Sequence, residues 1–331
     1  MMNQKTIQQI RERIHSARQI AIFSHIRPDG DTLGSLFGLG QALRMAGKSV
    51  QLISSDPLPK EGWFPGADST EAAQVQTYPD AFDLSICVDI SSRDRAGDYF
   101  QDHPEVQPDI VFDHHYSNPG FGKLNYVDDK AASNSEILTE LIPQLGLTMD
   151  AMSANYLLSG VLTDTQGFST SNVTPKTLQL AAALVAAGGN LYQLYADVIK
   201  AHSLEANALW EAAFRNSQVE LPLIWATIPH ADRVAAHYPD SDDASVVNRL
   251  LSSNGVKVAI VFMESPDGKR TKVSWRAKPG FNVADVATSF GGGGHIAASG
   301  ADVEMTLNET VEAVVAATKE MIRKADGIDL G

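Results

Sequence analysis

The sequence has a single cysteine, Cys87, among 331 residues. One cysteine excludes an internal disulfide and a metal site built from several thiolates. Because Cys87 lies in an apolar run, we expect a small buried thiol. The sequence also lacks an apolar run long enough to span a bilayer, and its first residues, Met-Met-Asn-Gln-Lys, do not resemble a signal peptide. We therefore expect a cytoplasmic protein with no membrane partner.

Positive charge is also scarce. The chain has 26 Lys and Arg against 40 Asp and Glu, a formal net charge of −14. This balance argues against a broad basic face, so we expect no binding to duplex DNA. A short or small polyanion could still bind where metal ions and a few local cations neutralise it.

The length favours about two domains. In the first part of the chain, short apolar runs alternate with helical stretches, which is typical of βαβ units and an α/β fold with a mostly parallel sheet and flanking helices. The predicted strands cover residues 20–23, 49–54, 84–88, 110–112 and 124–127. The predicted helices cover residues 4–18, 133–145, 150–163 and 176–187, and one more begins near residue 31.

The pattern changes in the second part of the chain. Residues 190–214 form one predicted helix, which we interpret as a helical linker between domains 1–189 and 215–331. The later predicted strands cover residues 218–228, 256–263 and 270–276. The later predicted helices cover residues 243–253, 282–290 and 308–325. These elements predict a second, smaller α/β domain.

Candidate metal ligands follow the first predicted strand. His25, Asp29 and Asp31 lie between the end of that strand and the start of a helix, around Pro28 and Gly30. Ligands bind at this position in open α/β sheets. One imidazole and two carboxylates are suitable ligands for a divalent metal. The alternative is that Asp31 only caps the helix and Asp29 only forms the turn.

Three more acids stand at comparable positions. Asp89 and Asp113 each end a strand, His114 and His115 follow Asp113, and Asp164 ends a helix. In a parallel sheet the strand ends converge on one edge, where clustered carboxylates repel by about 4 kcal/mol per pair at 4 Å and an effective dielectric of 20. Two divalent cations relieve this repulsion. Each acid alone could be a turn former, and the histidines could be surface residues.

These stretches resemble the motifs of the DHH phosphoesterase superfamily. The first is His25-Ile-Arg-Pro-Asp29-Gly30-Asp31, the second is Val88-Asp89, the signature triplet is Asp113-His114-His115, and the fourth is Leu162-Thr163-Asp164-Thr165. Residues 291–295, Gly-Gly-Gly-Gly-His, resemble the glycine-rich motif of the associated DHHA1 domain. The overall pattern resembles the nanoRNase/pAp-phosphatase (NrnA-like) branch, which implies a DHH catalytic domain followed by a DHHA1 substrate-binding domain.

The resemblance implies roles for individual residues. One metal ion would bind His25, Asp29 and Asp89, and a second would bind Asp31, Asp89, His114 and Asp164, so Asp89 would bridge the two. A hydroxide between the ions would attack the phosphate. His115 would face the substrate phosphate and assist catalysis. The ligand types favour Mn²⁺, with Mg²⁺, Co²⁺ or Zn²⁺ as alternatives.

The second domain carries candidate substrate-binding residues. Gly291, Gly292, Gly293 and Gly294 would expose backbone N–H groups to a phosphate beside His295, although a flexible loop is the alternative. On the strand over 270–276, Ser274 and Arg276 lie on the same face as Arg270, Lys272 and Lys278, and together they suggest a phosphate clamp, although each alone could be solvated surface. Asn248 and Arg249 are weaker candidates, and Trp275 is expected in the core.

The leading functional hypothesis is a metal-dependent phosphoesterase that hydrolyses short single-stranded RNA to mononucleotides and, as a further activity, pAp to AMP. One alternative is a phosphodiesterase for cyclic or linear dinucleotides. Another is a non-catalytic nucleotide-binding protein of the same fold. The oligomeric state stays open, with a homodimer as one option.

Overall fold

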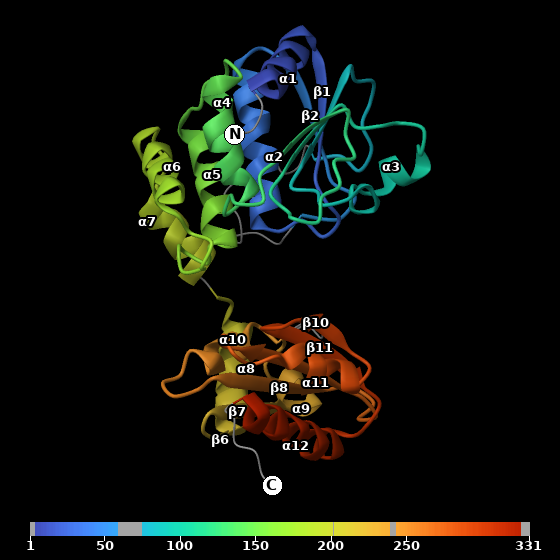
Figure 1. Ribbon diagram of the computed structural model, residues 1–331, viewed down its shortest axis with the longest axis vertical. Coiled ribbons are helices and arrows are strands. Elements are labelled where there is room, and N and C mark those ends of the chain that lie inside the picture. The colour runs from blue at the N-terminus through green and yellow to red at the C-terminus, as the bar shows by residue number, and fades with distance from the viewer. Residues whose placement is uncertain (1–3, 59–74, 201, 239–242, 326–331) are drawn as a thin grey trace. The chain divides into compact units, whose positions relative to one another are not determined.

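Two β-sheets organise the chain, one in each of two units that comprise Met1–Ala201 and His202–Gly331 (Figure 1). The computed structural model describes residues 4–58, 75–200, 202–238 and 243–325. Within these ranges no helix is long and apolar enough to cross a membrane. Each unit is taken separately below.

The first unit contains a five-stranded sheet in the order β2-β1-β3-β4-β5, with all neighbours parallel. Its strands are β1 (Gln19–Phe23), β2 (Ser49–Ile53), β3 (Leu84–Val88), β4 (Ile110–Asp113) and β5 (Leu124–Val127). The predicted parallel sheet is therefore confirmed. Since all five strands run the same way, the residues that follow them meet at one edge.

Helices cover both faces of this sheet, and α4 to α7 lie together on one side of the unit (Figure 1). The helices are α1 (Gln4–Ser16), α2 (Gly30–Met45), α3 (Asp98–Asp102), α4 (Asn134–Gln144), α5 (Ala151–Asp164), α6 (Pro175–Ala186) and α7 (Leu191–Leu194). A 3₁₀ turn over Arg93–Arg95 precedes α3, and a π-helical turn over Tyr195–Lys200 follows α7.

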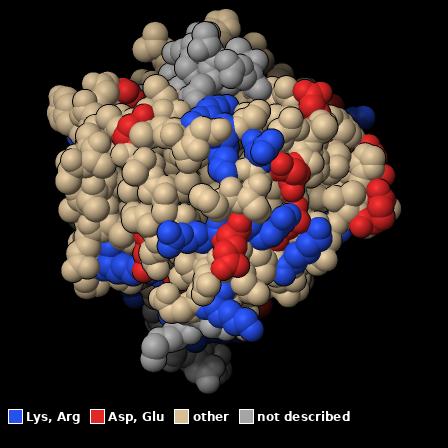
Figure 2. Space-filling view, turned by 90° about the horizontal axis from the view of Figure 1, so that it is seen from above, with Lys and Arg blue, Asp and Glu red and all other residues tan. Residues whose placement is uncertain are grey.

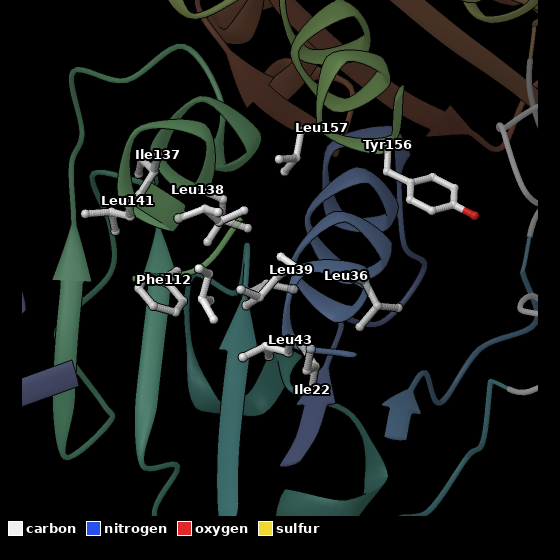
Figure 3. Close-up of a cluster of buried hydrophobic side chains, with 14 of the residues drawn as sticks. Ile22, Leu36, Leu39, Leu43, Phe112, Ile137, Leu138, Leu141, Tyr156 and Leu157 are labelled. Atoms are coloured by element: carbon white, nitrogen blue, oxygen red, sulfur yellow. The ribbon is translucent and has the colours of Figure 1, made fainter. Parts of the chain in front are cut away.

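The strands alternate their side chains between two cores, as the period of two requires. Ile22 and Phe112 point to the larger core, which helices α2, α4 and α5 close with leucines and isoleucines (Figure 3). Phe23 and Cys87 point to the smaller core on the opposite face, against Phe100 of α3. The predicted burial of the Cys87 thiol is thus confirmed.

Two glycines let α2 and α5 approach closely. A Cβ atom at Gly34 would lie 2.6 Å from the carbonyl oxygen of Tyr156 and 2.9 Å from the Cα of Gly160. A Cβ atom at Gly160 would lie 2.1 Å from Ser135 Oγ and 2.8 Å from Asp31 Oδ1. Neither position can hold a side chain without moving these atoms. The contact fixes the separation of the helices that carry Asp31 and Asp164.

The expected single helix over residues 190–214 is wrong. In the structure α7 ends at Leu194, the π-helical turn ends at Lys200, and a new helix, α8 (Leu204–Arg215), begins in the second unit. Ser203 is the physical cause of this new start, because its side chain accepts a hydrogen bond from the backbone N–H of Ala206 at 3.0 Å.

The second unit has a six-stranded sheet in the order β10-β11-β9-β8-β7-β6, in which only β7 and β8 are parallel among the described strands. Its strands are β6 (Ser217–Glu220), β7 (Leu223–Ile228), β8 (Val258–Glu264), β9 (Thr271–Ala277), β10 (Gly293–His295) and β11 (Ala298–Val303). Beside α8, its helices are α9 (His230–Ala235), α10 (Val246–Leu251), α11 (Val283–Ser289) and α12 (Leu307–Ala325).

The structure corrects two expectations about these strands. The predicted strand over residues 218–228 is a hairpin of β6 and β7, with Leu221 and Pro222 in the turn, because proline has no N–H to donate within a continuous strand and favours turns. The glycine-rich segment is only partly a loop, since Gly293 and Gly294 already pair with β11. Helices α11 and α12 cover one face of this sheet, and α8 and α10 cover the other.

Candidate metal centre

The acids and histidines singled out in the first unit meet at the carboxyl edge of its sheet. Two groups of three could each hold a metal ion, with all ligand atoms of a group within 4.8 Å of one another. The first group is His25, Asp29 and Asp89. The second group is Asp31, His114 and Asp164. A third group overlaps them and joins Asp89 with His114 and His115.

In the first group, His25 Nε2 lies 3.8 Å from Asp29 Oδ2 and 3.6 Å from Asp89 Oδ2. Two ligand atoms that bind one ion at about 2.1 Å and at right angles are about 3 Å apart, so a small inward movement would bring these atoms to bonding distance. Asp29 is also the N-cap of α2, because its Oδ1 accepts hydrogen bonds from the N–H groups of Asp31 and Thr32. The residue that caps α2 is therefore Asp29 and not Asp31. The other carboxylate oxygen of Asp29, Oδ2, faces His25.

In the second group, His114 Nε2 lies 3.3 Å from Asp164 Oδ2 and 4.0 Å from Asp31 Oδ2. Asp31 is fully buried at the start of α4, where its two oxygens accept the N–H groups of Asn134 at 2.6 Å and Ser135 at 2.9 Å. The positive end of the α4 dipole also favours a carboxylate at this position. Thus Asp31 lies in the first turn of one helix, α2, and its side chain binds the N-terminus of another, α4.

Asp89 lies between the two groups. Its Oδ2 faces His25, while its Oδ1 lies 3.4 Å from His114 Nε2. Thr32 Oγ1 donates a hydrogen bond to Oδ2 at 2.6 Å, but the buried Oδ1 has no hydrogen-bond partner among the described residues. The backbone of Asp89 is left-handed, with φ of 58°, a conformation that aspartate and asparagine adopt more readily than most other residues with a side chain.

The pKa shifts of these groups reflect a shortage of positive charge in the cluster. Burial raises the pKa of Asp31 and of Asp164, and the charge of Asp89 raises both further. Burial alone would lower the pKa of His114, but the Asp89 carboxylate 3.4 Å away and the other nearby carboxylates raise it. Each shift reduces the net negative charge of the cluster. A divalent cation would do the same without protons.

The donor set fits divalent metal ions. His25 Nδ1 lies 2.7 Å from the carbonyl oxygen of Ile26, and a hydrogen bond there leaves Nε2 free toward the two carboxylates. The buried Asp89 Oδ1 also lacks the partner that a cation would supply. Imidazole mixed with carboxylate suits Mn²⁺, Zn²⁺ and Co²⁺, and carboxylate alone suits Mg²⁺. The residues present are therefore compatible with two ions.

Asp113 belongs to the signature triplet but to neither predicted set of metal ligands. Asp113 is fully buried, and its Oδ1 lies 2.7 Å from His115 Nδ1. Its Oδ2 accepts a hydrogen bond from Asn118 Nδ2 at 2.7 Å, and the same amide donates to the carbonyl oxygen of Ile90 at 3.0 Å. Asp113 therefore orients the ring of His115 and anchors the turn that follows it. In the sequence, the only signal for this role of Asp113 is an asparagine, Asn118, five residues after the end of β4.

The candidate substrate-binding residues lie in the second unit. Ser274 and Arg276 are half-buried on β9, while Trp275 between them points to the core and is fully buried, as expected. Arg276 donates to the carbonyl oxygen of Trp275 at 2.8 Å. His295 lies opposite Ala298 in the short β10–β11 hairpin, and Ala298 lies opposite Arg276. The hairpin thus brings His295 close to Arg276.

Arg249 is held inside the second unit. Its guanidinium lies 3.4 Å from the ring centroid of Trp210, and Nη2 lies 2.8 Å from His202 Nε2. Asn248 precedes it on α10 and is exposed. These contacts favour an anchoring role for Arg249 over substrate binding.

The charged side chains on one face of the molecule are of mixed sign (Figure 2). Figure 2 shows one face of the molecule, on which Lys and Arg are interspersed with Asp and Glu and do not form a continuous basic stripe. Several of the described cations are paired, such as Lys176 with Glu140 and Arg215 with Glu211. This face offers no extended track for a long nucleic acid.

Comparison with known proteins gives a consistent result. Residues 19–182 match the DHH family, N-terminal domain, and residues 233–324 match the DHHA1 domain. The chain is 30% identical to the bifunctional oligoribonuclease and PAP phosphatase NrnA of Thermus thermophilus, over 92% of this chain and 91% of that protein. It is 27% identical to the protein of the same name from Bacillus subtilis, over 86% and 89% of the two chains.

A solved structure supports the fold. An exopolyphosphatase-related protein from Bacteroides fragilis superposes with a TM-score of 0.84 and covers 98% of both chains at 23% sequence identity. At this identity the similarity concerns the fold alone. The superposition includes residues of both units.

Proposed function

Because the chain belongs to the DHH family and carries the associated DHHA1 domain, we propose that it is a metal-dependent phosphoesterase that hydrolyses short oligoribonucleotides to mononucleotides and pAp to AMP. The observation that carries this proposal is Asp89, whose two oxygens face two separate groups of metal ligands. The activities for which the relatives are named support the substrate class. The two groups of candidate metal ligands support the reaction type.

Two ions would be held by the residues of the first unit. His25, Asp29 and Asp89 would bind one, and Asp31, Asp89, His114 and Asp164 would bind the other, with Mn²⁺ as the first choice and Mg²⁺, Co²⁺ or Zn²⁺ as alternatives. Such ions supply a nucleophile at neutral pH and neutralise charge on the phosphate.

The protein's own groups would position the substrate and move a proton. His115 is oriented through Nδ1 by Asp113, which leaves Nε2 for the substrate. We assign to Nε2 a hydrogen bond to the departing oxygen of the phosphoester. Asp113 is a positioning residue in this scheme, because it acts only through His115.

The second unit would bind the nucleotide. Arg276 and Ser274 on β9, with His295 and the backbone of Gly291 to Gly294, provide donors for a phosphate. Arg276→Ala should raise KM for dinucleotides about tenfold, while cleavage of a small generic phosphodiester changes little. Arg323→Ala is the matched control, because Arg323 lies on α12 and pairs with Glu320. Equal losses on both substrates would refute the clamp.

A substrate panel tests the whole proposal. End-labelled RNAs of two to about twenty nucleotides, pAp, a cyclic dinucleotide, a linear dinucleotide and pyrophosphate are incubated with Mn²⁺ and the purified protein. We expect rapid hydrolysis of the shortest RNAs and of pAp, with long RNA spared. Preference for the cyclic dinucleotide would move the function to second-messenger turnover. Tight binding without hydrolysis of any ester would favour a nucleotide-binding protein.

The setting of this activity is a further part of the proposal. The single buried cysteine and the acidic surface suit an enzyme of the cytoplasm that acts on short single strands and not on duplex DNA. Size-exclusion chromatography with light scattering would determine whether the enzyme works as a monomer or a homodimer.

A further inference from the structure

An exposed aromatic side chain directly follows the histidines of the metal centre in the sequence. Tyr116 follows the Asp113-His114-His115 triplet and is 89% exposed, whereas the preceding His115 side chain is 39% exposed and lies 3.7 Å from Asp89. Consecutive Cα atoms are about 3.8 Å apart, so the phenol ring starts one residue from the ligand cluster. Of the large apolar side chains reported as exposed, none has a greater exposed fraction.

The turn that carries Tyr116 is held rigidly. The N–H of Asn118 donates to the carbonyl oxygen of His115 at 3.1 Å, which closes a turn with Tyr116 at its first corner. The Asn118 side chain then ties the far end of the turn to Asp113 and Ile90, and its Oδ1 accepts the N–H of Gly120 at 2.8 Å. The backbone of Tyr116 is therefore fixed relative to His115 although its ring is open to solvent.

We infer that Tyr116 stacks on a nucleobase of the substrate and makes the enzyme selective for nucleotides over base-free phosphoesters. The inference rests on the proposed function, because it concerns the substrate of the same centre. The carboxylates and histidines proposed as metal ligands would be occupied by metal ions and phosphate oxygens. An exposed aromatic ring on a fixed turn supplies the apolar surface that a base needs, at little cost in conformational entropy.

Binding of two small ligands isolates the contribution of the base. Adenosine 5′-monophosphate and ribose 5-phosphate carry the same phosphate, but only the first carries a base. In calorimetric titrations of the Mn²⁺-loaded full-length protein, Tyr116→Ala should weaken AMP binding about tenfold and leave ribose 5-phosphate binding unchanged. Tyr116→Phe keeps the ring and should stay within about twofold of the wild type.

A matched control and a kinetic measurement complete the test. Tyr192→Ala removes a tyrosine that is also 85% exposed, on α7, and should change neither affinity. With the dinucleotide ApA, Tyr116→Ala should raise KM about tenfold with kcat nearly constant. Wild-type AMP affinity in Tyr116→Ala, or an equal loss for ribose 5-phosphate, would overturn the inference. So would failure of the wild type to bind AMP.

The two proposals can fail separately. If the wild type binds AMP through Tyr116 but hydrolyses no dinucleotide, the stacking inference stands and the proposed activity is wrong. If the wild type hydrolyses ApA and Tyr116→Ala does so with unchanged KM, the activity stands and the stacking role is wrong.

Discussion

The two ends of the sheet in the first unit use aspartate in opposite ways. At the carboxyl end, Asp31, Asp89 and Asp164 face one another and two histidines, with no lysine or arginine paired with them among the described residues. At the amino end, Asp109 accepts hydrogen bonds from the N–H and Oγ of Ser85, and it pairs with Lys123 at 3.0 Å and Arg13 at 3.3 Å.

The difference appears directly in the pKa values. Burial tends to raise the pKa of Asp109, but the hydrogen bonds from Ser85 and the charge of Lys123 outweigh it, so its pKa is lowered. Burial and neighbouring carboxylates raise the pKa of Asp31 and Asp164. The donors around Asp109 stabilise the folded protein, whereas the acids at the other end carry an electrostatic cost that a bound cation would remove.

The largest effect should follow from removing the shared carboxylate charge. Asp89→Asn keeps the size of the side chain and suits a left-handed backbone, but it leaves no charged oxygen between the two ligand groups. We expect hydrolysis of a dinucleotide to fall at least about 1,000-fold, and bound Mn²⁺ measured by mass spectrometry to fall below one ion per chain.

Thermal unfolding makes this result specific to the metal. Excess Mn²⁺ should stabilise the wild type by about 3 kcal/mol at 100 times its dissociation constant, and the same addition should stabilise Asp89→Asn far less. The metal-free variant should be at least as stable as the metal-free wild type, because a repulsive charge is gone. An active, fully loaded Asp89→Asn protein would contradict the bridging role.

The next effect concerns the opposite end of the sheet. Asp109→Asn leaves Lys123 and Arg13 without their half-buried counter-charge, and it should lower the free energy of unfolding by about 2 kcal/mol in urea titrations. The Mn²⁺ response and kcat should stay unchanged, since Asp109 lies at the other end of the strands. A loss of activity without a loss of stability in Asp109→Asn would contradict the conclusion that Asp109 serves stability and not catalysis.

The same variant has a defined pH dependence. The pKa of Asp109 is lowered on folding, so its stabilising contribution is fully present above the pKa of the unfolded chain and disappears as pH falls through the folded pKa. The stability gap between wild type and Asp109→Asn should therefore narrow when urea titrations at pH 7 are repeated at progressively lower pH. A gap that widens toward low pH would contradict the assignment.

The smallest effect is expected at Asp83, an exposed aspartate that can be compared with Asp109. Asp83 accepts the N–H groups of Arg18 and Gln19 at 2.9 to 3.1 Å, but its side chain is exposed and has no cation paired with it in the described residues. Asp83→Asn should cost about 1 kcal/mol in the same urea titration. A cost as large as that of Asp109→Asn would show that burial is not what separates the two sites.

Much of the fold was predictable because its signals are local. Each apolar run of the first unit became a strand of the parallel sheet, and the alternation of β9 placed Trp275 in the core. The helix expected over 190–214 failed because an internal cap at Ser203 has no effect on hydrophobic periodicity. The β10–β11 hairpin was missed since its first strand consists of two glycines and a histidine, which have low strand propensity.

The candidate metal centre was predictable for a topological reason, since parallel strands deliver their following residues to one edge. His25, Asp89 and His114 meet there as that rule requires. The support around them was not predictable. The bonds that join Asp113 to His115 and Asn118 depend on the conformation of one turn, and the bonds from α4 to Asp31 join residues more than 100 positions apart.

The contact between Gly34 and Gly160 bears on the radius of the ion that the second ligand group accepts. Mg²⁺ requires bonds of about 2.0–2.1 Å, whereas Ca²⁺ takes about 2.3–2.6 Å. Asp31 belongs to α2 and Asp164 belongs to α5. These helices can approach closely because Gly34 and Gly160 carry only a hydrogen atom at the position where other residues carry a side chain. The backbone contact of Gly34 with Gly160 therefore limits the distance at which Asp31 and Asp164 would meet a bound ion.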